Sequence, residues 1–171
     1  MNKKYITKSF QETQRLGQNL ARQILSGKSQ KFGVVLALSG DLGAGKTTFL
    51  QGFAKGLGVK EKILSPTFIL MKKFKILKTC VPQNGRPSIL RHKWFYHFDC
   101  YRLESPEPTS AKDYGVAKEI LDLGFKEIIL NPQNIVAIEW PEKISQVLPK
   151  DIISIIFNHK EKTMRELTIK E

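Results

Sequence analysis

A glycine-rich segment at residues 40–47 constrains this chain more than any other feature of its sequence. Its sequence, GDLGAGKT, fits the pattern G-x-x-x-x-G-K-[ST]. The backbone N–H groups of loops with this pattern surround phosphate oxygens. Gly43 and Gly45 allow a tight turn and a close approach of the backbone to an anion, where a Cβ would obstruct it. Lys46 brings a point charge to the β- and γ-phosphates, and the Thr47 hydroxyl is a ligand for Mg²⁺.

The residues on either side of this loop predict the strand and helix that a phosphate-binding loop requires. Residues 32–38 form a short, nearly all-apolar run, which predicts a buried strand. Residues 48–57 place apolar side chains on one helical face, and Gly58 follows as a stop signal. An ordinary glycine-rich turn is the alternative, but the order of strand, loop and helix favours a nucleotide site. The residues expected to line that site are Gly40, Asp41, Leu42, Gly43, Ala44, Gly45, Lys46, Thr47 and Thr48.

The length and composition are those of one globular domain. Residues 1–171 are enough for a substantial core, and no linker divides them. No run approaches the ~20 apolar residues of a membrane span, and the basic N-terminus has no apolar region behind it. Cys80 and Cys100 offer neither a disulfide framework nor the paired spacing of a zinc site. We therefore expect a cytoplasmic protein that does not associate with membranes.

The chain is strongly basic, with a net charge of +12 and a pI near 9.7. Such a charge suits a nucleic-acid partner but also a lysine-rich surface exposed to solvent, and charge alone does not decide between them. From residue 62 to residue 98 there is no acidic residue. Within this span we expect two strands joined by an exposed basic loop, an insertion at about residues 72–93. The insertion either faces tRNA or an acidic partner, or is a solvated hairpin.

Two acidic residues close predicted strands. Asp99 ends the aromatic run at residues 94–99, and Glu139 ends the aliphatic run at residues 135–139. One such residue alone is often a charge that reaches solvent. Two of them in a chain with a phosphate-binding loop favour a role in holding Mg²⁺ and the attacking water.

Thr67 lies on the segment that follows the predicted helix at residues 48–57. A hydroxyl at this place can sense a γ-phosphate or Mg²⁺, as switch loops do. Alternatively, Ser65 and Pro66 simply form a turn, and position alone leaves both interpretations open.

The rest of the chain predicts the outer parts of an α/β fold. Other expected elements are an edge strand at residues 5–7, a helix to residue 25 opened by a capping box of Ser9 and Glu12, a strand at 68–71, helical residues 110–130 broken at Gly124, and a C-terminal β-hairpin of residues 151–157 and 164–169.

Four motifs, in this order, resemble those of the TsaE (YjeE) family of P-loop ATPases. They are GDLGAGKTT at residues 40–48, SPTF at 65–68, HFDCYRL at 97–103 and EWP at 139–141. The resemblance covers nearly the whole chain. It implies a P-loop, three-layer α/β fold with a central, mainly parallel sheet and the C-terminal hairpin. The stretch between the second and third motifs is longer than usual in the family.

The resemblance also implies a function and partners. Members are required in bacteria for threonylcarbamoyladenosine, the modified adenosine beside the anticodon of ANN-decoding tRNAs. They act with the proteins TsaB and TsaD, and their hydrolysis of ATP with Mg²⁺ drives or resets that complex. Because the sequence identifies no arginine finger in the chain itself, we expect slow hydrolysis that depends on the partners. Whether tRNA touches this chain within the complex stays open.

Residue roles follow from the matched motifs. Lys46 and the loop amides would bind phosphates, Thr47 and Glu139 would hold Mg²⁺, and Asp99 would assist the metal or the attacking water. The other implied roles are a switch residue at Thr67, a side chain lying against the site at Trp140, and contacts with the nucleotide base from Phe10, Gln11 and Thr13.

A small-molecule P-loop kinase is the alternative function. A kinase needs an acceptor pocket and usually an arginine-bearing lid over the phosphates. Arg86 and Arg91 are the only candidates for such a lid in the long insertion, and no segment resembles an acceptor site. A GTPase is disfavoured because the chain has no N-K-x-D motif to bind guanine, for which residues 131–134 do not substitute.

Overall fold

The computed structural model describes residues 2–27, 30–66, 68–77, 91–103 and 115–171. Its strands are β1 (Asn2–Thr7), β2 (Val34–Ser39), β3 (Met71–Lys75), β4 (Trp94–Asp99), β5 (Asn134–Glu139), β6 (Ile153–His159) and β7 (Arg165–Lys170). Its helices are α1 (Phe10–Ser26), α2 (Lys46–Leu57), α3 (Gly115–Asp122), α4 (Phe125–Leu130) and the 3-10 helix η1 (Pro141–Val147).

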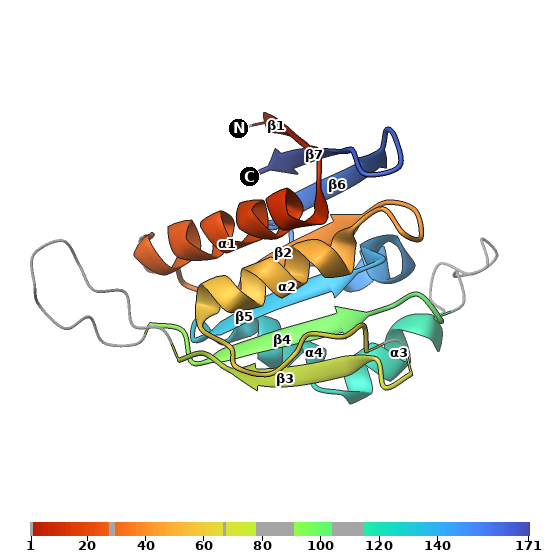
Figure 1. Ribbon diagram of the computed structural model, residues 1–171. Helices are drawn as coiled ribbons and strands as arrows, with labels where there is room; N and C mark the ends of the chain where they lie inside the picture. The colour runs from red at the N-terminus through yellow and green to blue at the C-terminus, as the bar shows by residue number, and fades with distance from the viewer. Residues whose placement is uncertain (1, 28–29, 67, 78–90, 104–114) are drawn as a thin grey trace, which may run out of the picture.

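The strands form one sheet in the order β1-β7-β6-β2-β5-β4-β3 (Figure 1). Strands β6, β2, β5 and β4 are parallel, whereas β7 and β1 on one side and β3 on the other are antiparallel to their neighbours. Helices α1 and α2 cover one face and α3 and α4 the other. The predicted three-layer α/β fold, with its parallel centre and C-terminal hairpin, is confirmed.

Strands β2 and β5 consist almost entirely of apolar residues because helices cover both of their faces. Their side chains alternate between a core shared with α1 and α2 and a second core shared with α3, α4 and η1. Among the described residues, no helix is long and apolar enough to cross a membrane.

Local capping signals define both helices on the first face. The Ser9 hydroxyl accepts a hydrogen bond from the Glu12 N–H at 3.2 Å, which begins α1 as predicted. The Glu12 carboxylate in turn accepts from the Lys8 N–H at 2.7 Å, one residue before the group that a capping box uses. Gly58 ends α2 in a left-handed conformation with φ 78°, as its position in the sequence predicted.

The predicted strand at residues 68–71 is wrong. The Ile69 N–H donates to the Pro66 carbonyl at 2.9 Å, and Leu70 has φ 57°, so the chain is still turning where a strand was expected. Strand β3 begins only at Met71. The run of apolar residues predicted a buried strand, but Phe68 and Ile69 are 86% and 56% exposed.

The two strands expected around the basic insertion are present, but residues 72–75, which were placed in the insertion, belong to β3. Strands β3 and β4 pair antiparallel, as expected for the two arms of a hairpin. Residues 78–90, which connect them, lie outside the described residues, as do residues 104–114 before α3. The expected break of the next helix at Gly124 is confirmed, since this residue has φ 76° and separates α3 from α4.

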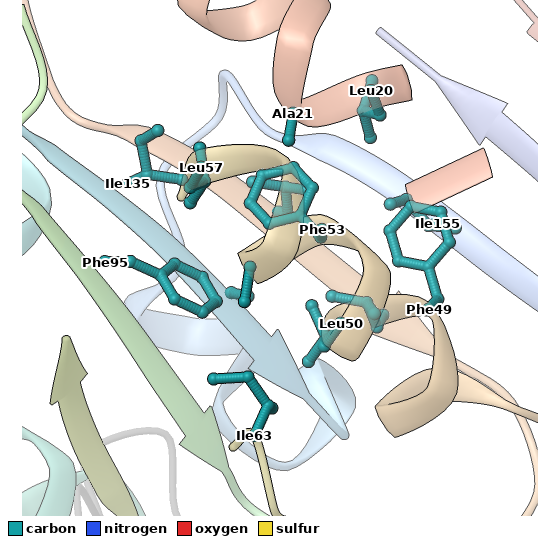
Figure 2. Packing of buried hydrophobic residues seen from close by; sticks show 14 of the residues in the cluster. Leu20, Ala21, Phe49, Leu50, Phe53, Leu57, Ile63, Phe95, Ile135 and Ile155 are labelled. Carbon is teal, nitrogen blue, oxygen red and sulfur yellow. The ribbon is translucent and has the colours of Figure 1, made fainter. Parts of the chain in front are cut away.

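The first core packs α2 between α1 and the sheet, and the predicted apolar face of α2 is confirmed. Phe53, Leu50 and Leu57 of α2 are fully buried and lie between α1 and the strands that carry Phe95 and Ile135 (Figure 2). The rings of Phe53 and Phe95 are 5.7 Å apart between centroids. This packing fixes the helix whose first turn carries Lys46 and Thr47.

Gly52 is the point of closest approach between α1 and α2, and its replacement should be costly. A Cβ at Gly52 would lie 1.9 Å from the Gln14 carbonyl oxygen of α1, so the helices would have to separate. Overpacking of this kind costs ~1–3 kcal/mol, whereas alanine gains ~1 kcal/mol in helix propensity over glycine. For Gly52→Ala we expect overpacking at the upper end of that range, so urea unfolding should show a net loss of about 2 kcal/mol. Lys55→Ala, at an exposed position of the same helix, is the matched control and should change the unfolding free energy little; equal stability of the two variants would contradict this packing.

Candidate nucleotide-binding site

The candidate site lies at the carboxyl ends of the central parallel strands. In the register of the sheet, Glu139 pairs with Leu38 of β2 on one side and with Asp99 of β4 on the other. The glycine-rich loop follows β2 directly, so the loop and both carboxylates meet at one edge of the sheet. Open α/β sheets bind their ligands at this edge.

The glycine-rich loop leaves the start of α2 open to an anion. Gly43 has φ 76° and Gly45 has φ 103°, both in the left-handed region that favours glycine. Gly45 is the N-cap of α2 and provides no side-chain hydrogen bond, so the positive end of the helix dipole faces the cavity without a capping side chain. The cavity has a volume of about 370 Å³ and is lined by Leu42, Gly43, Ala44, Gly45, Lys46, Thr47, Thr48, Ser65, Phe68, Asp99, Tyr101, Glu139 and Trp140.

Lys46 is buried and folded back onto its own loop. Its Nζ donates to the carbonyl oxygens of Gly40 at 2.5 Å and Asp41 at 2.9 Å, and lies 3.9 Å from the centre of the Trp140 ring. Burial lowers the pKa of Lys46 below its ordinary value, and the carboxylate of Glu139 is the strongest of several that oppose this effect. The Lys46 ammonium therefore contacts two carbonyls and an aromatic ring. Phosphate oxygens can replace these groups as its partners.

Thr47 and Glu139 supply oxygen ligands of the kind that Mg²⁺ prefers. The Thr47 hydroxyl lies 3.0 Å from Oε1 and 3.2 Å from Oε2 of Glu139, which is 3% exposed. No cluster of three or more His, Cys, Asp or Glu side chains suited to a metal exists among the described residues. Mg²⁺ at nucleotide sites needs no such cluster, because phosphates and waters complete its coordination. The residues present fit this metal.

Asp99 is buried beside Glu139 and holds two loops together. Its Oδ2 accepts a hydrogen bond from the Ser65 hydroxyl, and its Oδ1 accepts from the Tyr101 N–H at 3.0 Å. Thr67, the predicted switch residue, lies outside the described residues, although Ser65 shows that its segment reaches Asp99. Burial raises the pKa of the neighbouring Cys100 thiol to about 12, which disfavours the reactive thiolate.

Trp140 has an unusual backbone conformation at the mouth of the cavity. Its φ is 60°, which is rare for a bulky residue and concentrates at functional sites. The Trp140 N–H donates to the Leu38 carbonyl at 3.2 Å, and its ring packs on Tyr101 with centroids 5.1 Å apart. This conformation aims the indole back over Lys46.

The family model of the threonylcarbamoyl adenosine biosynthesis protein TsaE matches residues 7–167. The chain belongs to the TsaE family. Among its relatives, the tRNA threonylcarbamoyladenosine biosynthesis protein TsaE of Nostoc sp. strain PCC 7120 is 36% identical over 146 residues, covering 85% of this chain and 75% of that protein. TsaE of Treponema pallidum is 31% identical over 164 residues and covers 96% of this chain and 97% of that protein.

The structural comparison agrees with the family. The crystal structure of YdiB from Bacillus subtilis matches with a TM-score of 0.65 and 26% sequence identity, covering 99% of this chain and 84% of that one. The P-loop fold expected from the TsaE resemblance is thereby confirmed.

The start of α1 lies next to the glycine-rich loop, where the base contacts were predicted. The Thr13 methyl is 4.0 Å from a Cβ built on Gly45. The Thr13 hydroxyl faces away, because it bonds to the Thr7 hydroxyl at 2.8 Å. Phe10 and Gln11 are exposed. Contacts of Phe10, Gln11 and Thr13 with a base stay a prediction.

Sequence reasoning missed two residues beside the site. His97 forms a hydrogen bond with Glu139 at 2.9 Å. The sequence feature that could have indicated it is a polar residue inside the aromatic run of β4. Arg165 of β7 lies 3.9 Å from a Cβ built on Gly45, and its guanidinium donates to the Met164 carbonyl at 3.1 Å. No local sequence pattern indicated Arg165, because β7 lies far from the loop along the chain.

Of the two arginines considered for a kinase lid, only Arg91 lies among the described residues, and it is placed away from the cavity. Arg91 contacts the Gly27 carbonyl near the start of β4, at the end of that strand opposite Asp99. Arg86 lies outside the described residues.

Proposed function

We propose that this chain is an ATPase subunit that acts in threonylcarbamoyladenosine modification of ANN-decoding tRNAs in the cytoplasm. The observation that carries the proposal is the cavity in which Lys46 and the uncapped start of α2 face the Thr47–Glu139 pair. Membership of the TsaE family gives the pathway. ATP would lie with its phosphates in the glycine-rich loop.

Each side chain of the site would have a separate role in ATP hydrolysis. Lys46 would leave the carbonyls of Gly40 and Asp41 for the β- and γ-phosphates, where its charge stabilises the transition state. Thr47 and Glu139 would hold Mg²⁺, which neutralises charge that develops on the phosphate oxygens. Asp99, buried beside them, would assist the metal or orient the attacking water.

Exposed apolar side chains surround the mouth of this cavity and suit a docking partner. Leu42, Phe68 and Tyr101 line the cavity and are 76%, 86% and 45% exposed, and Ile69 and Leu64, next in the chain to lining residues, are 56% and 50% exposed. We assign the surface to the TsaB–TsaD pair, and any contact with tRNA would come within that complex. Docking there would close the site and add catalytic groups to those of the described residues, so hydrolysis by the chain alone would be slow.

Replacing Phe68 should therefore weaken docking without disturbing the core. For Phe68→Ser we expect affinity for the TsaB–TsaD pair to fall roughly tenfold or more, since large apolar anchors dominate interface energies. Phe32→Ser is the matched control, because Phe32 is 46% exposed and lies two residues before β2. It is therefore at the end of this strand opposite the glycine-rich loop. Calorimetric titration measures both variants, and equal affinities would contradict this docking surface.

Reconstituted tRNA modification tests the proposed function as a whole. The reaction contains an ANN-decoding tRNA, the threonylcarbamoyl donor, TsaB, TsaD and this chain, with either ATP or a non-hydrolysable ATP analogue. We expect repeated turnover only with this chain and hydrolysable ATP. Equal modification without the chain, or with the analogue, would contradict the proposal.

A further inference from the structure

His97 is a fully buried polar residue on the face of the sheet that carries the candidate site. Side chains alternate along β4, so His97 shares a face with Asp99 and, on the paired strand, with Glu139. Its Nε2 lies 2.9 Å from Oε1 of Glu139, and the ring is 0% exposed. Because the buried ring has lost its hydrogen bonds to water, its contact with Glu139 determines its protonation pattern.

The geometry fixes which ring nitrogen carries the proton. Nδ1 of His97 is buried, and no group of the described chain bonds to it. A neutral ring with its proton on Nδ1 would leave a buried N–H unpaired and would aim the Nε2 lone pair at a carboxylate oxygen. A proton on Nε2 instead makes His97 a hydrogen-bond donor to Glu139.

Two donors then converge on a single oxygen of Glu139. Oε1 accepts from His97 at 2.9 Å and lies 3.0 Å from the Thr47 hydroxyl, whereas Oε2 has the longer contact with Thr47, at 3.2 Å. A carboxylate oxygen has about two lone-pair positions, so Oε1 is saturated and Oε2 keeps the capacity to accept a cation.

We infer that His97 is a positioning residue that orients Glu139 for Mg²⁺. The His97 N–H holds Oε1 and thereby presents Oε2 beside the Thr47 hydroxyl. This role rests on the proposed nucleotide function, because it concerns the metal that accompanies ATP. Groups that orient a metal ligand in this way are typically worth 10–100-fold in metal affinity or activity, roughly.

A pair of substitutions separates this role from a merely structural one. The amide nitrogen of His97→Gln falls near the place of Nε2, whereas that of His97→Asn falls near Nδ1. The probe is a non-hydrolysable ATP analogue, titrated into each purified chain with and without Mg²⁺. We expect His97→Asn to lose roughly 10–100-fold of the Mg²⁺-dependent gain in affinity and His97→Gln to retain most of it. Equal losses in the two variants, or an equal loss without Mg²⁺, would overturn the role.

A second measurement requires neither nucleotide binding nor a substituted chain. Nitrogen-15 NMR of the imidazole in the unsubstituted chain, without nucleotide, reports which ring nitrogen carries a proton. A proton on Nε2 supports the assignment, and an unprotonated Nε2 overturns it. If the chain failed to bind the ATP analogue at all, the proposed function would fail while this measurement still decided the contact between His97 and Glu139.

Discussion

Replacing Lys46 with alanine is expected to abolish productive use of ATP. Lys46 is 4% exposed and lines the cavity at the start of α2, where no side chain caps the helix. Its loss removes the point charge that would meet the β- and γ-phosphates. Removing one group that stabilises transition-state charge typically lowers kcat by roughly 10²–10³-fold, and we expect a loss of at least that size. Steady-state phosphate release measures it.

The matched control is Lys55→Ala, which removes an exposed lysine from the same helix. It should leave turnover unchanged, because Lys55 lies at the end of α2 away from the loop. Circular dichroism confirms that both variants fold. Unchanged turnover in Lys46→Ala would refute the assignment of the phosphate site.

Replacing Glu139 with alanine should separate metal-dependent hydrolysis from ATP binding. The carboxylate bonds to Thr47 and His97 at the bottom of the site, whereas the loop that would bind the phosphates stays intact. We expect Mg²⁺-dependent turnover to fall roughly 10²-fold or more, and affinity for ATP measured without Mg²⁺ to change little.

Glu119→Ala is the control for this second variant, because Glu119 is an exposed acid of α3, which covers the other face of the sheet. It should retain both binding and turnover. An equal loss of ATP affinity and turnover in Glu139→Ala would show that Glu139 serves the structure of the loop rather than the metal.

The sequence predicted those parts of the fold that local chemistry determines. Strand β2 and helix α2 were correct because apolar runs, the glycine loop and Gly58 act within a few residues of one another. The strand at residues 68–71 was wrong because the same apolar letters serve an exposed turn as well as a buried strand. Only tertiary contacts distinguish the two.

The candidate site was predictable to a similar extent. Lys46 and Thr47 belong to a linear motif, and Asp99 and Glu139 end strands, so sequence places them at one edge of a parallel sheet. The contact of His97 with Glu139 depends on the register between β4 and β5, and the position of Arg165 depends on β7 folding back beside the loop. Neither of these follows from spacing along the chain.

Mg²⁺-dependent ATP turnover by the purified chain, alone and with the TsaB–TsaD pair, tests the central claim most directly. We predict low turnover by the chain alone and a clear rise when the pair is added, because docking over the exposed rim of the cavity would complete the site. Turnover that is indifferent to the pair, but is triggered by a small-molecule phosphate acceptor, would contradict the ATPase-subunit account and indicate a kinase.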